Sequence, residues 1–192
     1  MRKPRVCIVS PAAAAANNGN WHTAARWQRF LAPVADVHTA LAWLGEPVDA
    51  LIALHARRSA DSIARFTQVH PGAPLAVVLT GTDLYRDIQT DPIAQRSLQL
   101  ADRLVVLNEL GAAALPAEHH AKTTVCLQSS PTRRTLPKTG RHLRALMVGH
   151  LRDEKSPRTY YEAARRLAAR PDILLDHIGS DLDPAQIGRA HV

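Results

Sequence analysis

Seven short apolar runs recur along the chain, and polar or helix-like sequence separates them. The runs are continuous rather than alternating, which is typical of strands buried on both faces of a parallel sheet. They lie at residues 5–10, 49–56, 74–81, 102–108, 123–129, 143–150 and 172–179, with a weaker candidate at 35–41. Strand and helix therefore alternate, and we predict an α/β fold with a doubly wound, Rossmann-like parallel sheet.

Helix signals fill the intervals between these runs. Apolar residues at helical spacing, namely Trp27, Phe30, Leu31 and Val34, predict a helix that packs through this face, begins near His22 or Thr23 and ends at Pro33. Asp91–Pro92 and Ser156–Pro157 each have the pattern of an N-cap residue followed by proline in the first helical turn. These two dipeptides predict the starts of two further helices.

The strongest candidate for a domain boundary is Ser129–His142, which is polar and basic and contains two prolines. We therefore expect a first domain at 1–128, a linker at 129–142 and the start of a second Rossmann-like domain at 143–186. The second stretch is too short to bury both faces of a parallel sheet, so we expect that domain to be incomplete. Residues 187–192, IGRAHV, match a translated sequencing adapter and are expected to be a tail unrelated to the fold.

The net charge of +7 and the pI near 10.1 raise the question of a nucleic-acid partner. The basic residues occur as scattered pairs, such as Arg57–Arg58 and Arg165–Arg166, without a dense run. This distribution favours an ordinary solvated surface or a small phosphorylated ligand. We expect no nucleic-acid partner.

Several other classes of protein are disfavoured by missing patterns. The ten histidines form no His-Glu-x-x-His motif and no Cys/His quartet, so the spacing predicts no metal site. Cys7 and Cys126 lie in apolar runs, which favours buried thiols over a disulfide framework. No Gly-x-Gly-x-x-Gly follows the first run, so no nicotinamide cofactor is expected. With no long apolar segment and no secretory signal, we expect a cytoplasmic protein without integral membrane contact.

Polar segments follow the predicted strands where ligands of parallel sheets bind. The first, SPAAAAANNGNWHT, places Asn17–Asn20 and His22 before a helix whose free amides can attract an anion. An ordinary loop with an asparagine or threonine cap remains an alternative. In the second, His55, Arg57 and Arg58 follow the run at 49–56, either as ligand-binding residues or as a satisfied histidine with solvated arginines.

Two further segments have the same character. Thr80–Asp83, TGTD, follows the run at 74–81 and can bind hydroxyl groups, orient a reacting group or form an Asx turn. In the segment MVGHLRDEKSP, Gly149 is followed by Arg152 and Lys155 ahead of a helix. Cations beside exposed amides suit a diphosphate, whereas ordinary surface charge is the other interpretation.

Together, the segments NNGN, TGTD, ADRLVVLNE (residues 101–109) and VGHLRDEKSP (residues 148–157) occur in an order that resembles one enzyme family. That family comprises the retaining-type nucleotide-sugar glycosyltransferases of family 4, which have the GT-B fold. The resemblance spans most of the chain. It implies a first domain for the acceptor, a second Rossmann-like domain for the nucleotide-sugar and no cofactor beyond these substrates.

Within family 4, the longer segments SPAAAAANNGNWHTAARWQRFLAP and DALIALHARRSADSIARF are similar to the branch of selenosugar synthases in selenoneine biosynthesis. This similarity implies a UDP-sugar donor, UDP-glucose or UDP-N-acetylglucosamine, and selenophosphate as acceptor. The implied products are a 1-selenosugar and UDP.

The resemblance also implies roles for individual residues. Asp83, Thr82 and His55 become candidates for catalysis. The acceptor and its phosphate are expected at Asn17, Asn18, Gly19, Asn20, His22, Arg57, Thr80 and Gly81. The donor diphosphate is expected at Gly149, His150, Arg152 and Lys155.

The chain departs from the family pattern at two of these positions. His150 stands where the family has arginine, so the diphosphate role is expected to fall to Lys155 and Arg152. Thr80 replaces the family's catalytic histidine. A hydroxyl acceptor usually needs a general base, whereas selenophosphate arrives anionic and needs less deprotonation. The second departure therefore favours the selenium acceptor.

The acidic donor-site pair of the family is not assigned in this chain. Glu154 and Glu162 have its spacing, but they lie too early in the second domain. We expect the pair beyond residue 192 and therefore expect this chain to be an inactive, C-terminally truncated form. Two alternatives stay open: a family 4 enzyme with a hydroxyl acceptor, and a non-catalytic phosphate- or nucleotide-binding module.

Overall fold

The computed structural model describes residues 2–13, 15, 18–132, 134–135, 137–151 and 155–180. The chain divides into two compact units, Met1–Ser130 and Pro131–Val192. The division falls inside the segment that we expected to be a linker.

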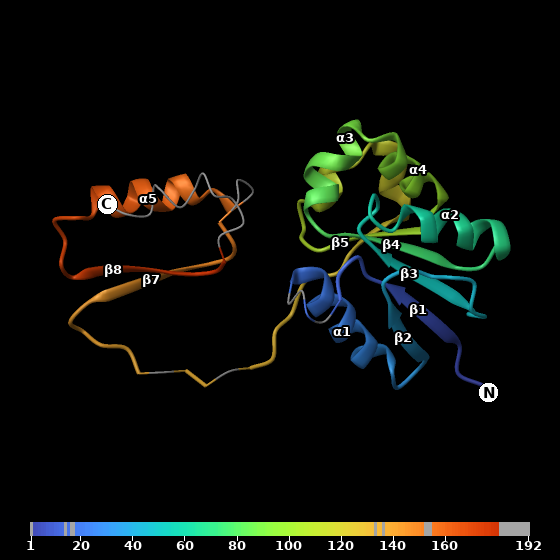
Figure 1. The fold of residues 1–192 in the computed structure, drawn as a ribbon, viewed down its shortest axis with the longest axis horizontal. Coiled ribbons are helices and arrows are strands. Elements are labelled where there is room, and N and C mark those ends of the chain that lie inside the picture. Colours follow the sequence, from blue (N-terminus) through green and yellow to red (C-terminus); the bar gives the residue numbers. More distant parts are fainter. Residues whose placement is uncertain are drawn as a thin grey trace. The chain divides into compact units, whose positions relative to one another are not determined.

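A six-stranded parallel sheet forms the first unit (Figure 1). Its strands lie in the order β2-β1-β3-β4-β5-β6, and every neighbouring pair is parallel. The predicted strands at these positions are confirmed, including the weak candidate that becomes β2. The strands are β1 (Arg5–Val9), β2 (Asp36–Ala40), β3 (Ala50–Leu54), β4 (Leu75–Leu79), β5 (Arg103–Val106) and β6 (Thr123–Val125).

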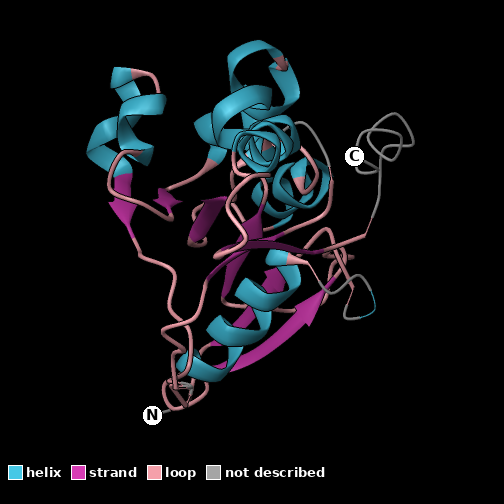
Figure 2. Cartoon of the chain, turned by 90° about the vertical axis from the view of Figure 1, so that its left-hand side faces the viewer, coloured by secondary structure: helices cyan, strands magenta, loops and turns pink. Residues whose placement is uncertain are grey.

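Helices cover both faces of this sheet (Figures 1 and 2). The helix α1 (Gly19–Leu31) packs on one face, and α2 (Ala60–Val69) and α4 (Pro92–Leu100) pack on the other. The first unit is thus a doubly wound, Rossmann-like α/β fold, as predicted. Shorter helical segments are η2 (Asp83–Asp87), α3 (Ile88–Thr90), η3 (Gly111–Ala114) and η4 (Ala117–Lys122).

Successive side chains of the central strands point to opposite faces of the sheet, so each strand contributes to both halves of the core. In β3, Leu54 faces Ala24 of α1, whereas Leu51 and Ala53 join Phe66 of α2 on the opposite face. Each of these side chains is at most 1% exposed. Burial on both faces explains why the run in the sequence is continuously apolar.

The strand order also locates the carboxyl edge where a ligand is expected. The chain moves from β1 to β2 at one side and then returns to β3 at the other side of β1. In doubly wound sheets, the crevice at such a reversal is where ligands bind. The loops that follow β1 and β3 flank this point.

Three expectations about the first unit are wrong. Cys126 is exposed, because β6 is a three-residue edge strand that ends at Val125 before the chain leaves the sheet. The helix expected from His22 starts three residues earlier, at Gly19, because Asn18 caps it. The apolar Phe30 at its end is 64% exposed, since the stripe that packs on the sheet is carried by Trp27 and Leu31.

The described residues of the second unit form two parallel strands and one helix. They are β7 (Leu143–Val148), α5 (Pro157–Arg166) and β8 (Ile173–Ile178), with Val148 paired to Ile178. Its strands are not buried on both faces as predicted: Leu143 is 64% exposed and Ile178 60%. Ser156 precedes α5 as expected, yet its side chain bonds Thr159 rather than a backbone amide.

Candidate functional site

His55 follows β3 in a backbone conformation that side chains rarely adopt. Its φ is 72°, in the left-handed region. For a residue other than glycine this conformation costs about 1–2 kcal/mol. The His55 amide donates to the carbonyl of Val78 in β4 (2.8 Å), and the His55 carbonyl accepts from Ser59 (3.0 Å). These bonds hold a buried imidazole, 3% exposed, at the carboxyl end of the sheet.

Asp83 joins the ends of β3 and β4. Its carboxylate is completely buried and accepts hydrogen bonds from the amides of Thr80 (2.8 Å) and Ala56 (2.9 Å). The second oxygen lies 3.9 Å from Nδ1 of His55. Two of the catalytic candidates, His55 and Asp83, are therefore neighbours, and Asp83 also fixes the two loops on which the cluster is built.

A second buried carboxylate, Asp87, lies on the other side of the imidazole. The π-helical segment η2 carries both aspartates. An oxygen of Asp87 lies 3.9 Å from Nε2 of His55, and the side chain is 5% exposed. Sequence reasoning missed Asp87, although its position four residues after Asp83 in a helical segment was a usable signal.

Arginine side chains cover the outer side of Asp87. Arg57 lies 3.6 Å from Asp87 through one guanidinium nitrogen and 3.2 Å from Asp91 through Nε. Arg86 also contacts Asp87, at 3.1 Å. The predicted phosphate-binding residue Arg57 thus already has two acidic partners, while half of its side chain remains exposed.

Burial and the neighbouring charges set the protonation state of His55. Burial lowers its pKa below the usual value, and the cations Arg58 and Arg57 act in the same direction, whereas Asp83 and Asp87 oppose the shift. The amide of Arg58 donates to Nδ1 at 3.4 Å. This contact leaves the single proton of the neutral ring on Nε2, which faces Asp87. The cluster therefore presents a neutral imidazole.

The other residues of the TGTD segment form the turn that leads into η2. Gly81 has a φ of 113°, so a residue with a side chain would be strained there. Thr80 lies at the end of β4, and Thr82 is half-buried at the start of η2 without a side-chain cap bond. Tyr85 accepts a hydrogen bond from Asn108, which links this segment to the end of β5.

The loop after β1 uses its polar residues differently. Asn18 is the N-cap of α1, and its Oδ1 accepts from the amides of Asn20 (3.1 Å) and Trp21 (3.2 Å). Gly19, Asn20 and the exposed His22 form the first turn. The capping alternative considered for this loop is therefore what the structure contains at Asn18, whereas Asn17 lies outside the described residues.

The same helix end is attached to the segment that follows β6. Thr23 is buried and accepts from Gln128 at 2.9 Å, while its hydroxyl donates to Gly19. Arg26 donates to Ser129 at 3.4 Å. The first turn of α1 is thus held by contacts from a distant part of the chain, which no local pattern indicates.

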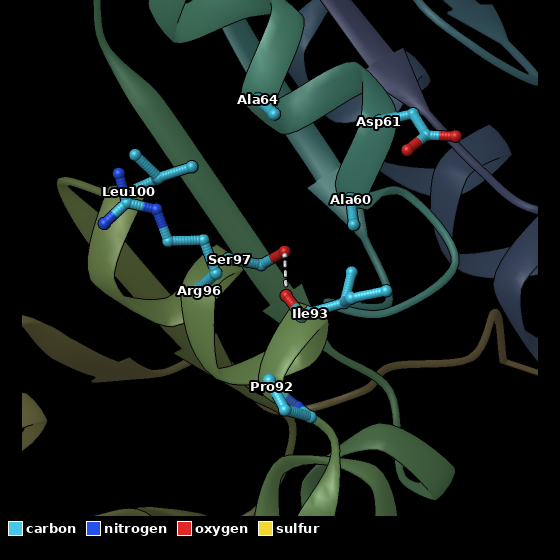
Figure 3. Close-up of a pocket in the computed structure, with 8 residues that line it drawn as sticks. All are labelled: Ala60, Asp61, Ala64, Pro92, Ile93, Arg96, Ser97 and Leu100. Carbon is cyan, nitrogen blue, oxygen red and sulfur yellow. Dashed lines mark hydrogen bonds between the residues drawn. The ribbon is translucent and has the colours of Figure 1, made fainter.

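Two hollows lie near these loops. One, of about 200 Å³, is lined by Trp21, by Thr39 and by residues at the ends of β1 and β2. The other, of about 310 Å³, is an apolar groove between α2 and α4 (Figure 3). Its end at Ala60 and Ile93 is close in sequence to Arg57 and Asp91. Of the predicted site residues that the structure describes, none lines either hollow.

The donor-site residues predicted in the second unit come together at the carboxyl end of β7. Gly149 has a φ of 150°, and a Cβ built there would lie 3.5 Å from the side-chain carbons of Lys155. Nδ1 of His150 accepts from the amide of Ser180 (3.1 Å). Gly149, His150 and Lys155 are therefore neighbours, whereas Arg152 lies outside the described residues.

The comparisons with known proteins leave the family open. No protein-family model matches this chain, and no curated protein matches it significantly. Among the described residues, none of the helices has both the length and the apolar content needed to cross a bilayer. The interpretation of the site consequently depends on its own geometry.

Proposed function

We propose that the protein is a cytoplasmic glycosyltransferase of the GT-B, family 4 type with selenophosphate as its acceptor. The donor is UDP-glucose or UDP-N-acetylglucosamine. The selenium atom attacks C1 of the sugar, and the bond between C1 and the β-phosphate oxygen breaks. UDP leaves with the bonding electrons, and the first product is a sugar joined through selenium to phosphate. Water then cleaves the P–Se bond, which releases inorganic phosphate and the 1-selenosugar.

The cluster of His55, Asp83, Asp87 and Arg57 is the observation that carries this proposal. It gathers titratable side chains at the carboxyl ends of β3 and β4, beside the point where the strand order reverses. Ligands of doubly wound sheets bind at this place. The left-handed backbone of His55 adds support, because strained residues concentrate at functional sites.

The protonation of the cluster suits an acceptor that is already anionic. His55 is neutral and buried, and its Nε2 proton faces Asp87, so the ring is not placed to take a proton from an acceptor. Selenophosphate needs no proton removed from its selenium before attack, so the site requires no strong general base. Arg57, half of whose side chain is exposed, supplies positive charge at the rim of the cluster.

For the donor, the proposal assigns the diphosphate to Gly149, His150 and Lys155. The ammonium group of Lys155 can offset the charge that develops on the leaving UDP. The long side chain lies over Gly149, where no Cβ intervenes. Arg152 is assigned to the same role from its sequence position.

A second candidate, a hydroxyl acceptor, is favoured by the charge balance around Arg57. Asp87 and Asp91 already contact this arginine, so an anionic acceptor must compete with two carboxylates. A neutral hydroxyl group avoids that competition, and Asp87 can accept its proton. The acceptor assay below separates the two candidates.

The test incubates the protein with each UDP-sugar and with selenophosphate, inorganic phosphate or a simple sugar. UDP release is measured. We expect release with selenophosphate and none with the sugars. Release with sugars alone overturns the selenium acceptor and supports the hydroxyl alternative, whereas UDP-sugar binding without release for any acceptor indicates a non-catalytic module.

A matched pair of variants tests the cluster in the same assay. Arg57→Gln should lower kcat/KM for selenophosphate, because it removes charge beside the imidazole. Arg65→Gln removes an equal charge from the exposed face of α2 and should leave turnover unchanged. Equal activity of the two variants would assign the cluster a purely structural role.

A further inference from the structure

Three potential metal ligands meet at the β2 edge of the first unit, away from the cluster around His55. They are Cys7 of β1, His38 of β2 and Glu46 of the loop after β2. One ligand atom from each residue lies within 4.8 Å of the other two. The spacing of the sequence predicted no metal site, because the three residues come from two strands and a loop.

We propose that Cys7, His38 and Glu46 form a binding site for Zn²⁺. A thiolate, an imidazole nitrogen and a carboxylate oxygen are the ligand types that zinc takes in proteins, and a water completes the tetrahedron. Hard cations such as Mg²⁺ and Ca²⁺ prefer an all-oxygen set.

Strand pairing places the first two ligands beside each other. Cys7 and His38 are register partners in the parallel pair β1–β2. Cys7 is fully buried, whereas about half of the His38 side chain is exposed. The sheet thus supplies a buried sulfur and, next to it, a nitrogen that solvent and metal ions can reach.

The third ligand belongs to a loop that is already fixed. The Glu46 carbonyl accepts from Nε1 of Trp43 (2.9 Å), and the Trp43 side chain is almost fully buried. One Glu46 oxygen also accepts from the amide of Leu44 (3.0 Å). This leaves the other oxygen directed at Nε2 of His38, so little ordering is required when a metal binds.

The distance between the His38 and Glu46 ligand atoms agrees with the geometry of a tetrahedral zinc site. Nε2 of His38 and Oε1 of Glu46 are 3.3 Å apart. Two ligands at about 2.0–2.1 Å from a tetrahedral zinc are separated by about 3.3 Å. The Cys7 sulfur lies within 4.8 Å of both atoms, so a shift of about 1 Å or less brings it to the separation of about 3.5 Å that a tetrahedral zinc requires.

When Zn²⁺ binds, it replaces the proton of the Cys7 thiol. The Cys7 thiol loses its proton to solvent, a Zn–S bond forms, and no electron transfer is involved. The metal ties β1, β2 and the loop that carries Trp43 together. Thr39, next to His38, lines the 200 Å³ hollow, so the ion would also stiffen one wall of it.

The test titrates the reduced 192-residue chain with Co²⁺ and then with Zn²⁺, in a phosphine reductant. We expect one equivalent of Co²⁺ to produce thiolate-to-cobalt absorption, and Zn²⁺ to displace it. Cys7→Ser should abolish that absorption, whereas Cys126→Ser, which changes the exposed thiol, should keep it. Absence of the absorption in the unmodified chain, or its persistence in Cys7→Ser, overturns the proposal.

Two further variants keep the proposal testable if Cys7→Ser does not fold. His38→Gln and Glu46→Gln change partly exposed side chains and should each weaken metal binding by about 100-fold. Their controls, His142→Gln at a half-buried position of the second unit and Glu109→Gln at an exposed position of the first, should not change the affinity. Zn²⁺ should raise the thermal midpoint of the controls and not of the two variants. Unchanged affinity in His38→Gln and Glu46→Gln overturns the proposal.

Discussion

The loops after β1 and after β3 lie at the same edge of the same sheet, yet they use polar residues in opposite ways. After β1, Asn18 satisfies the first amides of α1. After β3, His55 is held in a left-handed conformation, and the buried Asp83 and Asp87 lie on either side of its ring. The first loop lowers the energy of a helix end, whereas the second maintains a strained and charged arrangement.

This difference separates two kinds of polar residue that look alike in a sequence. An asparagine before a helix contributes to folding through a cap, and its loss is felt as a loss of stability. A strained histidine costs stability and persists only because its surroundings over-determine it. We therefore expect opposite effects on the free energy of unfolding. Removing the Asn18 cap should lower it, whereas placing glycine at His55, which relieves the backbone strain, should raise it relative to alanine.

The largest effect is expected at Asp83, which supports the strained loop. Asp83→Asn should lower the free energy of unfolding by about 2–3 kcal/mol, because an amide group turned toward Thr80 or Ala56 leaves a buried N–H unpaired. Urea unfolding followed by circular dichroism measures the change. Asp36→Asn, on the exposed edge of β2, is the control and should stay within about 0.5 kcal/mol of the unmodified chain. A similar small effect for Asp83→Asn would remove the support role assigned to this carboxylate.

The next effect is expected in the capped loop. Asn18→Ala should lower the free energy of unfolding by about 1 kcal/mol, because the cap of α1 is lost. Asn18→Asp keeps an acceptor and should retain the stability, although its negative charge opposes an anionic ligand.

Comparison of these two variants separates capping from binding. Asn20→Ala serves as the control for the cap, because Asn20 bonds Asn18 through its backbone amide, which the substitution keeps. If Asn18→Asp is stable and weakens the binding of inorganic phosphate or UDP, the loop also binds the anion. If it is stable and binding is unchanged, Asn18 has a capping role alone.

A smaller effect with reversed sign is expected at His55. His55→Gly and His55→Ala both remove the imidazole, but glycine adopts a φ of 72° without steric cost. The glycine variant should therefore be more stable than the alanine variant by about 0.5–1 kcal/mol after the greater chain entropy of glycine is included. Thermal or urea unfolding measures this difference. At Arg65, inside α2, the same comparison should favour alanine by about 1 kcal/mol. If the alanine variant is more stable than the glycine variant at both His55 and Arg65, the backbone of His55 is not strained.

The smallest effect is a pH dependence that originates in the same ring. Because the folded-state pKa of His55 is lowered, mainly by burial and also by Arg58 and Arg57, the unfolded chain takes up the proton first as pH falls. The stability from the neutral ring is present above the unfolded pKa of about 6.5 and is lost as pH falls toward the folded pKa. His55→Asn lacks this dependence, so the stability difference from the unmodified chain should shrink between pH 8 and pH 5. A constant difference would contradict the lowered pKa.

The fold of the first unit could be predicted because its central strands are buried on both faces. Such burial forces continuous apolar runs, and these also determine which loops share the carboxyl edge. His55, Arg57 and Thr80–Asp83 were accordingly expected at one edge. The exposure of β6 and β7 could not be predicted, since a run of apolar residues does not reveal how many neighbours its strand has.

The contacts inside the site were harder to predict. Asp87 approaches His55 from η2, which is π-helical, and the meeting of Cys7 with Glu46 depends on strand register and on how one loop folds back. The cap at Asn18 was one of two alternatives that the sequence left open. Local sequence patterns thus indicate which segments contain the polar residues of a site, whereas the contacts between those residues depend on the tertiary structure.

The close approach of β7 and β8 at their ends has a consequence for mutational scans. A Cβ built on Gly179 would collide with the carbonyl oxygen of Gly149, so even alanine cannot enter without moving the backbone. A scan of all substitutions would therefore report intolerance at position 179 whether or not a ligand binds nearby. Intolerance at this glycine would reflect the contact between two strands. Evidence for a ligand requires a binding measurement on a folded variant with a substitution at another position.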